Sequence, residues 1–202
     1  MNWLLILDLF GVFVFALSGG FDGAKYRLDI LGITVLAIAA GVGGGMMRDM
    51  LLGIHPPAAF VDQRYLFACL AGALLAILFS HRVERHFIWV KLADAIGLGV
   101  FAAIGAAKAV EYQLGWVGVL MISALTATGG GVIRDLLVRE IPMILRTDFY
   151  ASAALIGGVI YLGTDKAGLD TETCLALSIG SAIIARLLAI RFDVSLPKAR
   201  RR

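Results

Sequence analysis

Seven apolar segments run along this chain, separated by short polar connections. They cover residues 3–21, 30–52, 65–79, 88–110, 114–138, 149–162 and 173–190. An α-helix needs about 20 mostly apolar residues to cross the hydrocarbon core of a bilayer, and only the third and sixth segments fall clearly short of that length. The pattern predicts an all-α membrane protein with seven transmembrane helices. No connection could hold a soluble domain, so residues 1–202 are expected to form a single transmembrane domain.

The first six segments form two copies of one three-helix unit. A shift of 86 residues places the pattern Gly-Gly-Gly-x-x-Arg-Asp at 43–49 on the same pattern at 129–135, and the register continues without a gap to Gly72 on Gly158. Three helices begin on one side of a membrane and end on the other, so the copy must be inserted upside down. The sequence predicts an inverted repeat of three plus three helices with a seventh added. We expect repeat one over about 3–80, repeat two over about 88–165, the extra helix over about 173–190 and a basic tail over 193–202.

The composition and the placement of basic residues support a membrane location and give its sidedness. Charged residues make up 16% of the chain, compared with about 25% in soluble domains. Lysine and arginine concentrate in cytoplasmic loops. One predicted side has only Arg64 and Lys166 in its loops, and the other collects Lys25, Arg27, Arg82, Arg85, Lys91, Arg139, Arg146, Arg191, Lys198, Arg200, Arg201 and Arg202. The N-terminus is therefore expected outside and the C-terminus in the cytoplasm.

Two glycine triplets lie inside the second and fifth segments, at Gly43, Gly44, Gly45 and at Gly129, Gly130, Gly131. Each glycine costs about 1 kcal/mol relative to alanine in a helix interior. Small residues allow close helix packing in membranes, but that use favours glycines one turn apart. Three in a row therefore favour a kink or break that exposes backbone carbonyls to a polar path.

Ionisable residues repeat beside the triplets. Arg48-Asp49 and Arg134-Asp135 follow them, and Asp8 and Asp94 open the first and fourth segments. Charges inside spanning helices normally face a partner or water. Pairs Asp8–Arg48 and Asp94–Arg134 would satisfy them, while adjacent Arg and Asp, about 100° apart on a helix, need not bond each other. Snorkelling of both arginines to the lipid headgroups is the alternative.

Five further polar residues are candidates for lining or gating a path. Asp22 and Lys108 occupy matching positions near opposite ends of the first and fourth segments, where placement at the membrane interface is the simpler alternative. Ser18, Thr126 and Thr128 lie near the triplets. Such hydroxyls often bond their own helix backbone instead.

The sequence gives no support for an enzyme. It contains no nucleotide-binding loop, metal-ligand cluster or nucleophile–base arrangement, and its three histidines fall in the connections. No metal, cofactor or nucleic-acid partner is predicted.

The duplicated Gly-Gly-Gly-x-x-Arg-Asp signature, with Asp-x-x-Gly at 8–11 and 94–97, resembles the bacterial relatives of the trimeric intracellular cation (TRIC) channels, often labelled as glycine transporter domains. The resemblance spans Asp8 to Ile190. It implies a symmetric homotrimer in the bacterial inner membrane, in contact with lipids, with a monovalent cation pore in each subunit. Potassium is the expected main ion, and helices two and five, with their glycine triplets, are expected to line the pore.

Two functional hypotheses remain at this point. The first is a passive cation channel, which the resemblance favours. The second is a secondary transporter of glycine or another small zwitterion, in which half-helix ends would hold the carboxylate and ammonium groups. A purely structural scaffold would leave the weak glycine triplets unexplained.

Overall fold

The computed structural model describes residues 3–80, 88–146, 149–192 and 194. Arg82, Arg85 and, apart from Val194, the expected basic tail lie outside the described residues. All described elements are helical. Seven longer helices match the seven apolar segments: α1 (Trp3–Lys25), α2 (Ile30–Leu51), α4 (Gln63–Leu78), α6 (Ile88–Glu111), α7 (Trp116–Leu137), α9 (Tyr150–Lys166) and α10 (Thr171–Phe192). Two short helices, α3 (Ala58–Val61) and α8 (Met143–Arg146), lie in connections that were expected to be irregular.

Five of these helices, namely α1, α2, α6, α7 and α10, are long and apolar enough to cross a membrane. α4 is apolar but has 16 residues, and α9 has 17. The fold is therefore that of an all-α membrane protein. Seven complete spans remain a prediction.

The polar connections set the helix boundaries, and they repeat in detail. The side chain of Asp29 caps α2 by accepting a hydrogen bond from the backbone N–H of Gly32 at 2.7 Å. Arg27 and Gln113, which are 86 residues apart, both adopt a positive φ (55° and 56°) in the turns after α1 and α6. Such left-handed residues end helices and reverse the chain. The sequence repeat is thus reproduced in backbone conformation.

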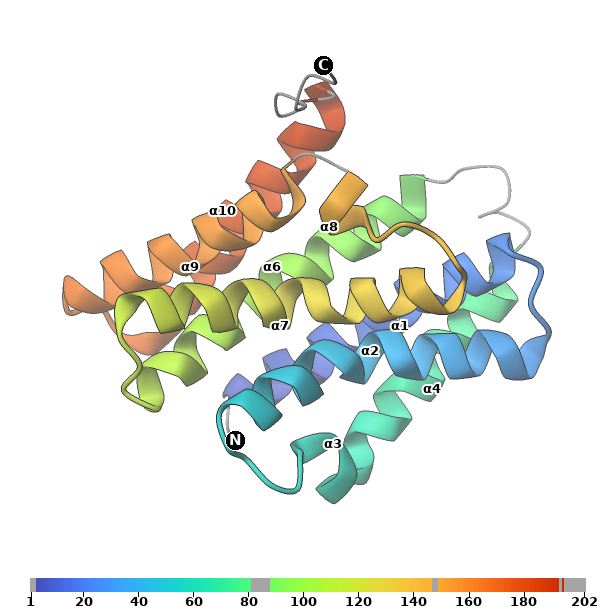
Figure 1. The fold of residues 1–202 in the computed structure, drawn as a ribbon, viewed down its shortest axis with the longest axis horizontal. Helices are drawn as coiled ribbons and strands as arrows, with labels where there is room; N and C mark the ends of the chain where they lie inside the picture. The colour runs from blue at the N-terminus through green and yellow to red at the C-terminus, as the bar shows by residue number, and fades with distance from the viewer. Residues whose placement is uncertain (1–2, 81–87, 147–148, 193, 195–202) are drawn as a thin grey trace, which may run out of the picture.

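The two halves pack with opposite sense. On α1 and α6, Gly11 lies against Phe101 while Gly97 lies against Phe15, so higher numbers on one helix meet lower numbers on the other. The rings of Phe15 and Phe101 meet at 5.1 Å between centroids. α2 and α7 also run antiparallel, and α4 contacts α1 and α2 as α9 contacts α6 and α7. Figure 1 shows these pairs side by side, with α10 against α6 and α9. An inverted repeat would give this arrangement.

The glycine triplets mark the crossing of α2 and α7, and both helices continue through them without interruption. The expected break is therefore wrong, whereas a kink, the other form of the expectation, stays a prediction. A methyl group on Gly44 would overlap the backbone carbonyl of Thr126, and one on Gly130 would overlap that of Ala40, at the matching place in the repeat. Glycine is needed here because the two backbones touch.

Each glycine of a triplet faces a different neighbour. Gly43 lies against Ile133, and its counterpart Gly129 against Met47. The third glycine of the second triplet, Gly131, lies against the hydroxyl of Tyr150. Consecutive helical residues point about 100° apart, so three in a row can serve three contacts. A triplet can therefore contribute to packing at more than one interface.

The repeat loses one residue in the connection after α7. Asp49 accepts a hydrogen bond from the backbone N–H of Ala58, nine residues later, whereas Asp135 accepts one from Met143, eight residues later. The first connection holds two prolines, Pro56-Pro57, where the second holds one.

Downstream of this deletion the spacing of the repeat is 85 residues. Gly72 packs against Ala16, and it is Gly157, not Gly158, that packs against the counterpart of Ala16, Ala102. The expected match of Gly72 with Gly158 is therefore wrong.

Candidate functional site

The first buried polar cluster surrounds Arg48, and we call it the Arg48 cluster. Arg48 on α2 holds both carboxylate oxygens of Asp8 on α1, at 3.2 and 3.1 Å, and its Nε donates to Asp49 at 2.9 Å. Tyr65 on α4 donates its hydroxyl to Asp8 at 2.8 Å. The side chain of Arg48 is 1% exposed, so it does not snorkel to the membrane surface.

The second cluster surrounds Arg134 on α7, and we call it the Arg134 cluster. Its guanidinium lies 2.9 Å from a carboxylate oxygen of each of three residues: Asp94 on α6, Asp22 on α1 and the neighbouring Asp135. Ser18 accepts a further hydrogen bond from Arg134 at 2.8 Å. This side chain is also 1% exposed.

Both predicted charge pairs, Asp8–Arg48 and Asp94–Arg134, are thus present. The expectation that adjacent Arg and Asp need not bond misses a contact, because Arg48 pairs with Asp49 and Arg134 with Asp135. The long arginine side chain bridges the angular offset. Each of these aspartates also accepts a backbone hydrogen bond from the short helix that follows, which fixes α3 and α8 against the clusters.

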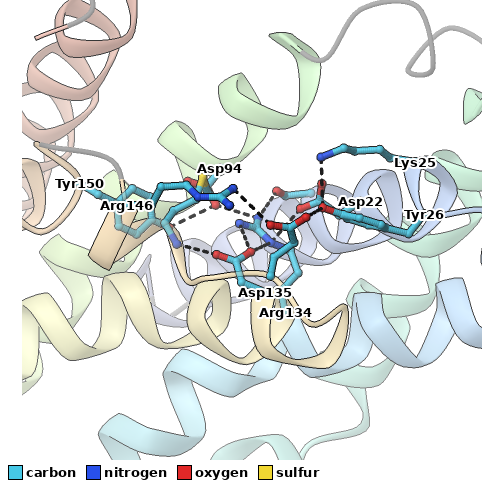
Figure 2. A network of polar contacts seen from close by, with 11 residues as sticks. Asp22, Lys25, Tyr26, Asp94, Arg134, Asp135, Arg146 and Tyr150 are labelled. Carbon is cyan, nitrogen blue, oxygen red and sulfur yellow. Dashed lines mark hydrogen bonds and ion pairs between the residues drawn. The ribbon is translucent and has the colours of Figure 1, made fainter. Parts of the chain in front are cut away.

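A cavity of about 210 Å³ opens beside the Arg134 cluster. Polar and charged side chains line much of it: Asp22, Lys25, Tyr26, Lys91, Arg134, Asp135, Glu140 and Arg146. Figure 2 shows Asp22, Arg134 and Asp135 gathered at the centre of the polar network, with Lys25 and Tyr26 approaching from α1 and the turn after it. The carboxylates of Asp22 and Asp135 therefore border the cavity while remaining buried.

A polar contact between the two halves closes one edge of this cavity. Tyr26, just after α1, donates to Glu140 at 2.9 Å, and Glu140 pairs with Arg146 on α8 at 3.2 Å. Burial, followed by the hydrogen bond to Glu140, raises the pKa of Tyr26 to about 12. The phenol therefore remains a donor throughout the neutral range.

The five lining or gating candidates lie in three different environments. Ser18 and Asp22 belong to the Arg134 cluster. Thr126 and Thr128 donate to Ile122 and Ala124 of their own helix at 2.6 and 2.8 Å. Lys108 is half-buried on α6 and does not line the cavity.

Sequence reasoning missed three residues of these sites. Tyr65 and Tyr150 donate equivalent hydrogen bonds to Asp8 and Asp94, but they are 85 residues apart, so a gap-free shift of 86 hides their equivalence. Arg186 is 3% exposed and lies over the ring of Tyr150, with 4.8 Å from its Cζ to the ring centroid. A charge in the middle of the seventh apolar segment was the available signal.

Known proteins resemble this chain over nearly its whole length. The family model described as Glycine transporter matches it twice, over residues 5–81 and 91–166. The UPF0126 membrane protein of Vibrio cholerae is 40% identical over 195 residues, covering 96% of this chain and 82% of that protein. This chain belongs to the UPF0126 membrane protein family. The UPF0126 inner membrane protein YadS of Escherichia coli K12 is 38% identical, covering 95% of this chain and 93% of YadS.

Solved structures show a second group of proteins that resemble this chain. A TRIC trimeric intracellular cation channel orthologue from Rhodobacter sphaeroides has 32% identity and a TM-score of 0.91, covering 96% of this chain and 100% of that chain. A prokaryotic TRIC channel determined in 0.5 M KCl has 34% identity and a TM-score of 0.89, covering 96% and 98%. The chain is thus a homologue of the TRIC channels, as the sequence signature indicated. These relatives are channels and membrane proteins, not enzymes.

The two family-model matches also carry the one-residue deletion. They begin 86 residues apart, at 5 and 91, and end 85 apart, at 81 and 166. The bounds of the two matches on this chain therefore agree with the shift seen in the packing.

Proposed function

We propose that this protein is a potassium-permeable monovalent cation channel of the bacterial inner membrane, working as a homotrimer with a pore inside each subunit. The proposed topology is seven spans, an inverted repeat, the N-terminus outside and the C-terminus in the cytoplasm. Homology to TRIC channels supports the cation channel.

The observation that carries this proposal is the charge of the Arg134 cluster. Three carboxylates, from Asp22, Asp94 and Asp135, share one buried arginine, so the formal charge is −2 with every group ionised. The cluster borders the 210 Å³ cavity. Negative charge focused between low-dielectric walls raises the local concentration of cations, and this cluster places it beside a cavity whose lining also holds Lys25, Lys91 and Arg146. The cavity is therefore the proposed inner vestibule of the path.

The constriction in this proposal is the crossing of α2 and α7. Backbone meets backbone there, with the carbonyls of Ala40 and Thr126 against Gly130 and Gly44. A small separation of the helices would turn those carbonyls toward a path, and carbonyl dipoles favour cations. Gly43–45 and Gly129–131 are thus proposed to line the pore without a helix break. In this proposal the structure describes the closed state of the channel.

The second candidate function is a carrier of a small zwitterion, and the vestibule gives a specific reason to test it. Its lining combines carboxylates with the basic side chains of Lys25, Lys91 and Arg146. Such a set could hold an ammonium group and a carboxylate of one ligand. The family model's description as a glycine transporter points the same way.

Reconstitution separates the two functions. Purified protein in planar bilayers should carry unitary potassium currents, while liposomes loaded with glycine should show no counterflow of radiolabelled glycine. Protein-free bilayers and liposomes serve as the control for leak. Glycine counterflow without potassium current from well-assembled protein would replace the channel by the carrier.

A further inference from the structure

Arg186 is a buried charge that the repeat does not explain. It lies on α10, the helix without a counterpart, and its side chain points into the bundle because the residue is only 3% exposed. Among the described residues (3–80, 88–146, 149–192 and 194), it forms no ion pair with a carboxylate, and its Nε has no hydrogen-bond partner. A charge so costly to bury in a membrane helix normally has a function.

A chain of contacts joins Arg186 to the Arg134 cluster. Its guanidinium stacks over the ring of Tyr150 at 4.8 Å, and the hydroxyl of Tyr150 donates to Asp94 at 3.2 Å. Asp94 is fully buried, and its second oxygen, Oδ2, has no hydrogen-bond partner within the described part of the chain. One carboxylate oxygen of Asp94 and one guanidinium nitrogen of Arg186, each without a hydrogen-bond partner among the described residues, therefore belong to groups of opposite charge on either side of one tyrosine.

The charges of the two clusters suggest what Arg186 does. The Arg48 cluster has one arginine and two aspartates, a formal charge of −1. The Arg134 cluster has one arginine and three aspartates, because Asp22 joins it. Counted together with Arg186, the Arg134 cluster again has a formal charge of −1, although Arg186 does not bond any of its carboxylates directly. Its field acts through protein rather than water, where charges interact more strongly.

We propose that Arg186 is a specificity-determining residue of the cation path, which limits how tightly the vestibule holds a monovalent cation. The inference rests on the proposed channel function. Conduction requires a site that attracts the ion but also releases it. The Arg134 cluster, at a formal charge of −2, would hold a cation too long at the edge of the vestibule, and the fixed positive charge on α10 weakens that hold without filling the cavity.

The test measures potassium conductance against KCl concentration for the parent, Arg186→Met and Arg186→Lys in planar bilayers. Methionine keeps an unbranched apolar stem against Tyr150, and lysine keeps the charge. For Arg186→Met we expect a half-saturating concentration about fivefold lower than in the parent, with higher conductance in dilute KCl and lower maximal conductance. Arg186→Lys should restore the parent curve. Arg191→Met, an exposed arginine on the same helix, is the matched control and should change the curve little.

Several outcomes would overturn the inference. The inference is wrong if both Arg186 variants assemble, conduct and keep the parental half-saturating concentration. It is also wrong if Arg186→Met weakens cation binding. A purely structural Arg186 would lower the unfolding temperature of both variants and leave the concentration dependence unchanged. Absence of potassium current from the parent protein would instead overturn the proposed function, and this inference with it.

Discussion

The Arg48 and Arg134 clusters come from the same repeated sequence but have different surroundings. Each has an arginine, the aspartate beside it, an aspartate from the preceding antiparallel helix and a tyrosine hydroxyl. The Arg134 cluster alone adds Ser18 and Asp22. Their counterparts in the repeat are Ile104 and Lys108, which cannot serve Arg48 in the same way.

This difference shows how a duplicated fold separates stability from function. The shared residues hold the helices together in both halves. The added residues bring an excess carboxylate to the half that borders the cavity. The asymmetry is therefore the best guide to the proposed path, and substitutions at matched positions test it directly.

The largest effect is expected from removing the central arginines. Arg134→Met leaves three buried carboxylates without their partner, and Arg48→Met leaves two. Breaking a buried ion pair costs about 3–5 kcal/mol, so both variants should unfold at lower temperature in detergent, with Arg134→Met the lower. Equal losses, or a greater loss from Arg48→Met, would contradict the unequal charge of the clusters.

At the crossing of α2 and α7, by contrast, matched glycine substitutions should lower the stability by similar amounts. Gly44→Ala and Gly130→Ala each drive a methyl group into a backbone carbonyl of the opposite helix, and overpacking of this kind costs about 1–3 kcal/mol. Gly45→Ala is the matched control, because the nearest atom beyond its own backbone is the Arg48 guanidinium at 3.8 Å. Thermal unfolding of the three variants should show two similar losses and no loss for the control. Equal tolerance at all three positions would remove the backbone contact as the reason for glycine.

A smaller and functional effect is expected from the matched pair Asp22 and Lys108. Asp22→Asn keeps the shape of the side chain but removes a carboxylate from the vestibule. Potassium conductance at low salt should fall about threefold and approach the parental value at high salt, because salt screens charge. Lys108→Gln should leave conductance near that of the parent. Flux is normalised to assembled protein, so that weaker pairing with Arg134 is not mistaken for weaker conduction.

The sequence alone predicts much of the fold and part of the candidate site. Apolar length locates the seven longer helices, and the repeat pairs Asp8 with Arg48 and Asp94 with Arg134. It does not give the backbone contact at the glycine triplets, because helix propensity describes a local cost whereas the opposite helix provides the compensating contact.

Two other parts of the site depend on packing that no local pattern reports. The equivalence of Tyr150 with Tyr65 is hidden in the sequence because a deletion shifts the register of the repeat by one residue. The joining of Asp22 to Arg134 needs the crossing of the two halves, which brings α1 beside α7. Sequence symmetry therefore identifies what the halves share more readily than what distinguishes them.

The smallest expected effect compares Tyr26 with its counterpart in the repeat, Tyr112. Tyr26 donates to Glu140, whereas Tyr112 is 46% exposed and Ile54 stands where Glu140 would be. Tyr26→Phe should lower the stability of the detergent-solubilised protein by about 0.5 kcal/mol, and Tyr112→Phe should not change it. Because the folded pKa of Tyr26 is raised to about 12, its contribution is full below the ordinary value near 10 and is lost as the pH rises through 12. The cost of Tyr26→Phe should accordingly be the same at pH 7 and pH 9. A cost that is absent at both pH 7 and pH 9 would mean that the contact with Glu140 does not hold the two halves together.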